Sequence, residues 1–251
     1  MYKMVLIDLD GTLLNSNKII TEFTANVIKG IKDNTKIVLA SARGFSRIKP
    51  YLKQLDLLDS KNYTIAFNGS LVMNNVEDKI IDEKIEYNNI KELIKFIFQN
   101  LNYEWIFYTY YEKVNIKNID DLDQFVLKND IYKIVCLSTK EKIDTLRNIV
   151  NENYDELFQI TSSESTRIEF VKKGATKLKG IKKLLEKLEI DRTEIIAIGD
   201  GENDLDMIKF AGCGIAMGNS PNNVKQAADM ITDTNDKDGV GKILIELSEK
   251  I

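Results

Sequence analysis

The chain of 251 residues contains no histidine. This absence excludes a Ser-His-Asp triad, a Cys-His nucleophile pair and any zinc site that uses histidine ligands. Acid–base chemistry in this protein must therefore use carboxylates, lysine, tyrosine or water. The sequence also has only two cysteines, Cys136 and Cys213, which lie far apart in apolar surroundings. We expect both to be buried, reduced thiols of a cytoplasmic protein.

Long apolar runs and an excess of positive charge are missing as well. No stretch approaches the roughly 18–20 apolar residues that a membrane span requires, and the N-terminus shows no signal-peptide pattern. The net charge is −4, and lysines are interleaved with acidic residues along the chain. We therefore expect no membrane and no nucleic-acid partner. The 43% of hydrophobic and 29% of charged residues are typical of a soluble globular protein with a sizeable core.

The first apolar run, MVLI, leads into two aspartates, Asp8 and Asp10, and then into Gly11. A run of this kind predicts a buried strand of a parallel sheet, and residues two apart on a strand share a face. Two neighbouring carboxylates repel each other, which implies a bound cation, a raised pKa on one of them, or both. The alternative is a strand followed by an ordinary Asp-Gly turn.

Further short apolar strands end in small or polar residues. They are predicted at 36–40, 64–67 and 194–198, and are followed by Ser41, Asn68 and Asp200. Because helical segments alternate with these strands, we expect right-handed crossovers and a parallel sheet. In such sheets ligands bind at the carboxyl ends of the strands, near the point where strand order reverses. The polar residues after the strands should therefore converge.

The character of the sequence changes between residues 83 and 172. Helices predicted at 89–101, 120–128 and 140–150 lie beside short, partly polar strands, as in a separate α+β unit. From Gly174 the first pattern resumes with a lysine-rich helix over 176–188. The predicted fold class is α/β, with a core domain of residues 1–82 and 173–251 that is split by an inserted α+β domain of residues 83–172.

We expect acidic residues from separate segments to meet at the carboxyl ends of these strands. Oxygen ligands without histidine or cysteine favour Mg²⁺ over zinc. Lys177 supplies a point charge suited to a phosphate or a carboxylate, while Ser41 and the backbone amides after it can bind an anion. Together these groups describe a phosphoryl-binding site that contains an aspartate. There are simpler alternatives for three of these residues. Lys177 could be one of the solvated lysines of its helix, and Asn203 and Asp204 could cap a helix.

A set of motifs in fixed order carries a family resemblance. The motifs are DLDGTLL, ASARG, FNGS, KGATK, GDGENDLDMI, AMGNS and DGVG. With them the sequence resembles the haloacid dehalogenase-like (HAD) hydrolases, in particular the Cof-like sugar phosphatases. Ala42 stands where the family usually has glycine before the arginine. The resemblance implies a Rossmann-like parallel-sheet core domain and assigns the inserted α+β domain as a cap.

The resemblance also implies a role for individual residues. Asp8 would be the nucleophile that forms an aspartyl-phosphate, and Asp10 would protonate the leaving alkoxide and then deprotonate the attacking water. The Mg²⁺ ligands would come from Asp8, Asp10, Asp200 and Asp204. The phosphoryl group would be bound by Leu9, Ser41, Ala42, Lys177 and Asn203, with Gly11, Arg43 and Asn68 as further site residues.

The function implied by this resemblance is Mg²⁺-dependent hydrolysis of a small phosphorylated metabolite, such as a sugar phosphate, by a cytoplasmic monomer or weak homo-oligomer. One alternative is a phosphomutase or phosphotransferase that uses the same aspartyl-phosphate. Another is a non-catalytic regulator that binds a phosphorylated metabolite.

Overall fold

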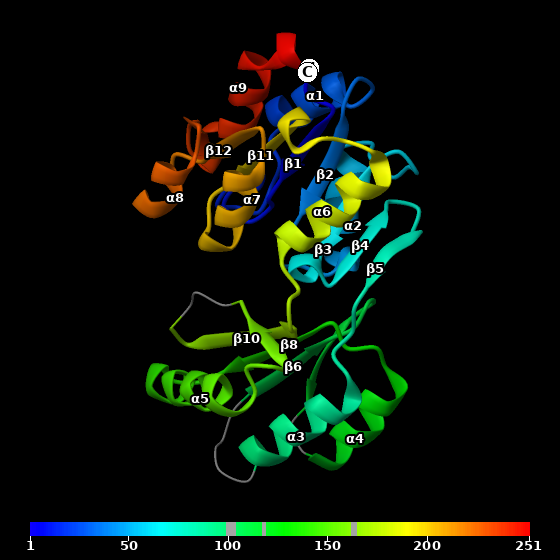
Figure 1. The fold of residues 1–251 in the computed structure, drawn as a ribbon, viewed down its shortest axis with the longest axis vertical. Helices are drawn as coiled ribbons and strands as arrows, with labels where there is room; N and C mark the ends of the chain where they lie inside the picture. Colours follow the sequence, from blue (N-terminus) through cyan, green and yellow to red (C-terminus); the bar gives the residue numbers. More distant parts are fainter. Residues whose placement is uncertain (99–103, 117–118, 162–164) are drawn as a thin grey trace. The chain divides into compact units, whose positions relative to one another are not determined.

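The computed structural model describes residues 1–98, 104–116, 119–161 and 165–251. These residues form two compact units, each built around its own sheet (Figure 1). The first, the core unit, comprises Met1–Arg43, Arg47–Ile81 and Thr176–Ile251. The second, the inserted unit, comprises Gly44–Ser46 and Asp82–Ala175.

The core unit contains an eight-stranded sheet in the order β13-β12-β11-β1-β2-β3-β4-β5. Its strands are β1 (Met4–Ile7), β2 (Lys36–Ala40), β3 (Tyr63–Ala66), β4 (Leu71–Asn74), β5 (Lys79–Asp82), β11 (Ile195–Gly199), β12 (Cys213–Ala216) and β13 (Met230–Ile231). Pairing is parallel from β13 to β3, and β4 then runs antiparallel to β3. Strand β1 lies between β2 and β11, so the strand order reverses at β1, where α/β sheets place their ligand sites.

Helices cover both faces of this sheet. They are α1 (Glu22–Ile31), α2 (Phe45–Gln54), α6 (Lys177–Leu188), α7 (Leu205–Phe210), α8 (Asn222–Ala227) and α9 (Gly239–Glu246). Alternate residues of β1, Met4 and Leu6, belong to a buried cluster with Ile181 and Leu184 of α6 and Met207 of α7. Helices α1 and α9 pack against each other. The period-two alternation of buried strand residues thus gives each face its own helical layer.

The start of α6 is fixed by a side-chain cap. The Thr176 hydroxyl accepts a hydrogen bond from the Lys179 backbone amide at 3.1 Å, which satisfies one of the unpaired amides of the first turn. This cap makes Lys177 the first helical residue, beside the carboxyl ends of the core strands.

The inserted unit is an antiparallel sheet with the order β7-β6-β8-β10-β9. Its elements are α3 (Tyr87–Phe98), β6 (Glu104–Tyr108), β7 (Lys113–Ile116), α4 (Ile119–Lys128), β8 (Lys133–Leu137), α5 (Lys140–Asn153), β9 (Phe158–Ile160) and β10 (Arg167–Lys172). Buried aromatic residues form its centre, with the rings of Trp105 and Phe170 stacked at 6.4 Å. Residues 99–101 of the helix expected over 89–101 lie outside the described residues.

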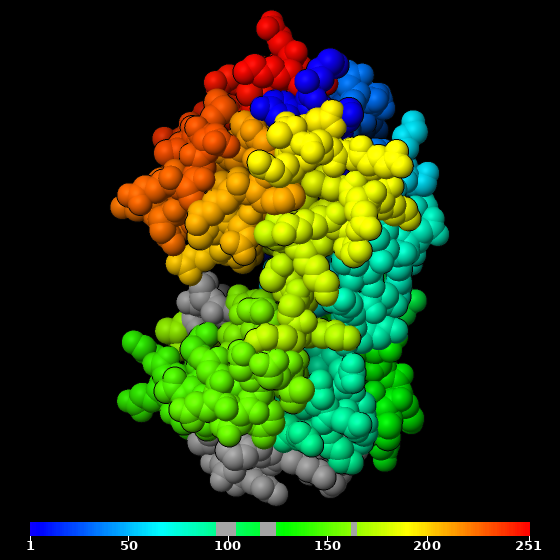
Figure 2. Space-filling view, viewed as in Figure 1, coloured from blue at the N-terminus to red at the C-terminus, as the bar shows by residue number. Residues whose placement is uncertain are grey.

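The predicted fold class, an α/β core split by an inserted α+β unit, is confirmed. Cys136 and Cys213 are buried, free thiols. No helix within the described ranges combines the length and the apolarity needed to cross a membrane. The first and last segments of the chain lie side by side on the core unit (Figure 2), where the Tyr2 amide donates to the Lys250 carbonyl at 2.7 Å.

Candidate active site

Three loops meet at the carboxyl ends of β1, β2 and β11. They carry Asp8 to Asp10, Ser41 to Arg43, and Asp200 to Asp204, respectively. The backbone ties them to their neighbours, since the Asp8 amide donates to the Ile198 carbonyl at 3.0 Å. The convergence expected from the strand pattern therefore exists in the core unit.

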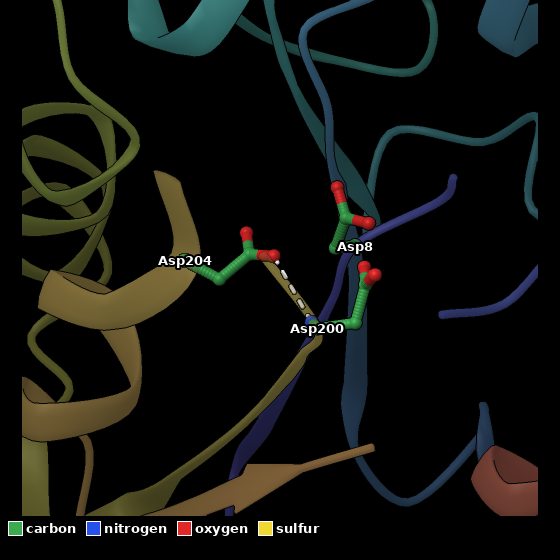
Figure 3. A group of neighbouring side chains, drawn as sticks. All are labelled: Asp8, Asp200 and Asp204. Atoms are coloured by element: carbon green, nitrogen blue, oxygen red, sulfur yellow. Dashed lines mark hydrogen bonds between the residues drawn. The ribbon is translucent and has the colours of Figure 1, made fainter. Parts of the chain in front are cut away.

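Asp8, Asp200 and Asp204 form an acidic trio at this edge. Their ligand atoms all lie within 4.8 Å of one another, and Figure 3 shows them projecting from β1 and from the loop after β11. One oxygen of Asp204 accepts hydrogen bonds from the Asp200 and Gly201 amides, at 3.1 and 3.0 Å. Asp204 is therefore held by the loop that also carries Asp200.

Lys177 enters the trio from the first turn of α6. Its Nζ lies 2.5 Å from Asp8 Oδ1 and 2.7 Å from Asp204 Oδ1, and its side chain is only 1% exposed. A solvated lysine, the simpler explanation for this residue, would be exposed. Asp204 is likewise buried, and because it accepts a hydrogen bond from Lys177 it does more than cap the short helical turn η3 (Glu202–Asp204).

The donor chemistry of the trio fits Mg²⁺. All three side chains offer carboxylate oxygens, and the trio contains neither a nitrogen nor a sulfur ligand. Mg²⁺ binds oxygens at about 2.0–2.1 Å in octahedral geometry, so opposite ligands stand about 4 Å apart. A separation of ligand atoms below 4.8 Å is compatible with that requirement. Three carboxylates against one lysine also leave negative charge that a divalent cation would balance.

The electrostatics of the trio follow from burial and from this surplus of acids. Burial raises the pKa of Asp8, against the lowering effect of Lys177, and the nearby Asp204 raises it again. Burial, with the Asp204 charge, raises the pKa of Asp200 to about 6. The pKa of Lys177 is raised because the two carboxylates outweigh its burial. The site thus favours a positive charge.

Asp10 does not join the acidic trio. Its carboxylate receives hydrogen bonds from Arg43 Nε at 2.6 Å and Arg43 Nη2 at 2.7 Å, and a third from Lys18 Nζ at 2.8 Å. Burial of Asp10 acts to raise its pKa, but these hydrogen bonds outweigh it and lower the pKa to about 2. The two aspartates of the first motif therefore occupy different environments.

Gly11 is required by the close approach of β1's loop to Asp200. Its φ is +87°, and a Cβ at this position would lie 2.3 Å from Asp200 Oδ2. Only glycine accommodates both the left-handed backbone and this contact. The Gly11 carbonyl also accepts a hydrogen bond from Asn219 Nδ2 at 2.8 Å.

The expected phosphate-binding residues lie on the same loops. Ser41 is buried and its hydroxyl accepts a hydrogen bond from the Arg43 amide at 3.1 Å, while Ala42 is half-buried. The side chain of Leu9 is buried in the core, so this residue can offer only its backbone amide to a ligand. Asn203 is exposed at the rim.

Asn68 is placed near Ser41 by the backbone. Its amide donates to the Ser41 carbonyl at 3.0 Å, and it is buried with φ +54°. Its Oδ1 has no hydrogen-bond partner among the described residues. The next residue, Gly69, is forced to be glycine, because a Cβ there would lie 2.1 Å from the Thr176 carbonyl oxygen. This loop thus packs against the start of α6.

Several contacts of the site were not predicted from the sequence. Thr12 Oγ1 donates to Asp200 Oδ1 at 3.0 Å, and Asn219 Nδ2 lies 3.4 Å from Asp200 Oδ2. Both residues stand inside motifs used for the family resemblance, DLDGTLL and AMGNS, which was the available signal. Lys18 and Tyr51 stand outside those motifs, and no sequence signal identified them.

The fold and the site together define the family. A family model described as haloacid dehalogenase-like hydrolase matches residues 5–244. The chain therefore belongs to this family of hydrolases, and the resemblance inferred from the motifs is confirmed.

Similar proteins match over nearly the whole chain. A Haemophilus influenzae protein is 34% identical over 98% of this chain and 98% of its own. The 5-amino-6-(5-phospho-D-ribitylamino)uracil phosphatase YcsE of Bacillus subtilis is 30% identical and covers 96% of this chain and 94% of its own. A crystal structure of a haloacid dehalogenase-like hydrolase from Bacteroides thetaiotaomicron has a TM-score of 0.87 at 29% identity, over 98% of this chain and 100% of that one.

Proposed function

We propose that this protein is a Mg²⁺-dependent phosphatase that hydrolyses small phosphorylated metabolites through an aspartyl-phosphate on Asp8. The observation that carries the proposal is the buried contact between Lys177 and Asp8 inside an acidic trio. Such a site offers a nucleophilic carboxylate and a fixed positive charge in one place, in a chain without histidine.

The proposed roles follow from the position of each group. Asp8 attacks phosphorus while Lys177, Ser41 and Asn203, with the amides of Leu9 and Ala42, bind the phosphoryl oxygens. Asp10, which Arg43 and Lys18 hold as a carboxylate, accepts a proton from the attacking water; when protonated, it gives that proton to a leaving oxygen. Asp8, Asp200 and Asp204, with the Asp10 carbonyl, would hold Mg²⁺, which when bound neutralises charge on the phosphoryl group.

Charge neutralisation is the main physical demand of this reaction. A carboxylate that approaches a phosphate dianion brings like charges into contact. A single like-charge pair at ~4 Å costs about 4 kcal/mol at an effective dielectric of ~20. Left unscreened, that cost would slow the reaction by about 10³-fold. Lys177 Nζ lies 2.5 Å from Asp8 Oδ1, so a positive charge that reduces this repulsion is already in place when the substrate binds.

The substrate class is proposed from the relatives. The Bacillus subtilis relative YcsE is named for a compound that carries a phosphorylated ribityl chain. We therefore propose a phosphorylated sugar or polyol as substrate. We also propose that the inserted unit is the cap that contacts the organic part of this substrate, and that the protein is cytoplasmic.

The experiment is a panel of phosphorylated metabolites assayed for release of inorganic phosphate, with MgCl₂ and with EDTA. The proposal predicts release that requires MgCl₂ and is lost in Asp8→Asn. Transfer of the phosphoryl group to an added sugar, without release of inorganic phosphate, would favour the phosphotransferase alternative. Ligand binding without phosphate release from any compound would favour the regulator.

A further inference from the structure

The unexpected feature of the core unit is the set of cationic contacts to Asp10. Arg43 binds both oxygens of the carboxylate in a fork, and Lys18 adds a third contact to Oδ1. A guanidinium fork fixes the plane of a carboxylate as well as its position, which a single lysine cannot do. The orientation of Asp10 is therefore set by residues outside the acidic trio.

Lys18 reaches Asp10 because of a compact turn. Its φ is +60°, a left-handed conformation that is costly for a residue with a Cβ. The turn is closed by the Lys18 amide, which donates to the Asn15 carbonyl at 2.9 Å, and by Asn15 Oδ1, which accepts from the Asn17 and Ile19 amides at 3.0 Å each. The loop thus holds a strained residue in the place from which its ammonium group meets Asp10.

Tyr51 of α2 joins the two cationic residues. Its hydroxyl accepts a hydrogen bond from Arg43 Nη1 at 3.2 Å and donates one to the Lys18 carbonyl at 3.3 Å. The Arg43 guanidinium carbon lies 5.4 Å from the centroid of the Tyr51 ring, within cation–π range. One turn further along α2, Gln54 Nε2 donates to the Ile20 carbonyl at 3.0 Å, so the loop is fastened to the helix twice.

This arrangement has a direct consequence for the site. Asp10 follows Asp8 by two residues, yet its carboxylate is held by Arg43 and Lys18 and is not one of the trio's ligands. Without these contacts a mobile carboxylate on the same strand end would be free to turn toward a cation bound there. The contacts therefore keep Asp10 separate from the cation ligands.

We propose that Lys18, Arg43 and Tyr51 are positioning residues that hold the Asp10 carboxylate for the second half-reaction, in which water attacks the phosphoryl group on Asp8. The proposal rests on the proposed phosphatase function. In this step the water oxygen bonds to phosphorus and its proton moves to Asp10. The P–O bond to Asp8 breaks, and its electron pair returns to the Asp8 carboxylate. The products are phosphate, free Asp8 and protonated Asp10.

The test separates the two half-reactions. p-Nitrophenyl phosphate has a leaving group that departs without a proton donor, so the first step should not depend on Asp10. In rapid-quench experiments with MgCl₂, we expect Lys18→Met and Arg43→Lys to release the first p-nitrophenol within about threefold of the wild-type rate. Decay of the phosphoenzyme should be slower by about tenfold or more, because a misplaced Asp10 loses part of the roughly 10²–10⁴-fold that a well-placed base contributes.

Graded variants sharpen the test. Tyr51→Phe keeps the ring but removes both hydrogen bonds, and should slow decay of the phosphoenzyme by about threefold. Lys18→Arg should restore decay relative to Lys18→Met. The matched control is Lys3→Met, which also removes one lysine from an exposed ion pair, with Glu194 at 2.7 Å, ahead of the first residue of β1. It should leave both steps unchanged, and thermal unfolding would verify that every variant is folded.

Two results would overturn the proposal. If the variants slow both steps equally, the three residues support the fold of the site as a whole. If they slow neither step, they do not position Asp10. Failure of the proposed function looks different: the wild-type protein would then form no phosphoenzyme and release no p-nitrophenol.

Discussion

Each unit of this molecule buries a lysine against acidic side chains, but the two clusters differ in charge balance. In the core unit, Lys177 contacts Asp8 and Asp204, with Asp200 close by. Three carboxylates thus share one lysine. This cluster lies where three strands end, and its charges are balanced only if a cation is added.

The inserted unit shows the opposite balance. Lys133 lies 3.1 Å from Glu169, and Arg167 also contacts that carboxylate, so in the contacts seen among the described residues two cations share this acid. Lys133 Nζ stands 4.8 Å from the centroid of the Tyr108 ring, which adds a cation–π contact. These residues lie along paired strands, with side chains of Lys133 and Glu169 only 5% and 6% exposed. The acid of this cluster is already neutralised by the protein.

A buried ion pair alone is therefore weak evidence for function. What distinguishes the core cluster is unbalanced charge at the point where strand order reverses.

Asp8→Asn should have the largest effect. Removal of the nucleophile is expected to lower the turnover rate by about 10⁴-fold or more. The fold should persist, because the substitution removes one member of a repelling trio. Phosphate release and thermal unfolding followed by circular dichroism would measure both effects. Asp56→Asn, which alters an exposed ion pair with Lys29, is the control and should keep wild-type turnover.

Lys177→Met should expose the charge imbalance of the core cluster. Its removal leaves three carboxylates without their buried counter-charge, at an expected cost of about 3–5 kcal/mol in the free energy of unfolding. MgCl₂ should restore part of the lost stability, because a ligand that binds the folded state stabilises it. Denaturant unfolding in EDTA and in MgCl₂ would measure this. A loss of stability that MgCl₂ leaves unchanged would contradict the cation assignment.

Lys133→Met should have a smaller effect that does not respond to Mg²⁺. Glu169 keeps its contact with Arg167, so we expect a loss of about 2 kcal/mol, less than for a fully broken buried pair. Trp105, the one tryptophan of the chain, lies in the inserted unit and provides its fluorescence probe. If MgCl₂ restored the stability of Lys133→Met, the two clusters would not differ in their response to Mg²⁺.

Binding of Mg²⁺ should weaken by about tenfold or more between pH 7.5 and pH 5. The pKa of Asp200 is raised to about 6, and that of Asp8 is also raised by burial, so both acids take up protons as the pH falls. A cation must displace those protons, so its affinity falls with the pH. Calorimetric titrations in buffers of different ionisation enthalpy would detect the released protons. An affinity that is independent of pH would contradict the raised pKa values.

The sequence predicted the strand ends better than it predicted the side chains around them. Apolar runs that stop at Asp8, Ser41 and Asp200 were enough to infer a parallel sheet and a shared edge, because local patterns determine both. The contact of Lys177 with Asp8 spans 169 positions and depends on the cap by Thr176 and the packing of α6. No local pattern encodes such a distance.

The partners of Asp10 could not be predicted from the sequence. Asp10 lies two residues after Asp8 in the same motif, and both side chains were predicted to face one site. Its partners are an arginine from the loop after β2 and a lysine from a left-handed turn. A turn of that kind at a non-glycine residue is not readable from sequence pattern alone.

In the proposed reaction, Asp8 carries the phosphoryl group during turnover. The protein is quenched with acid during its reaction with a phosphorylated metabolite and MgCl₂, and is then treated with borohydride. Borohydride reduces an aspartyl-phosphate to homoserine. We predict that mass spectrometry of the tryptic peptides will find homoserine at position 8 only in samples that received substrate. Homoserine at another aspartate, or at none while phosphate is released, would contradict the account.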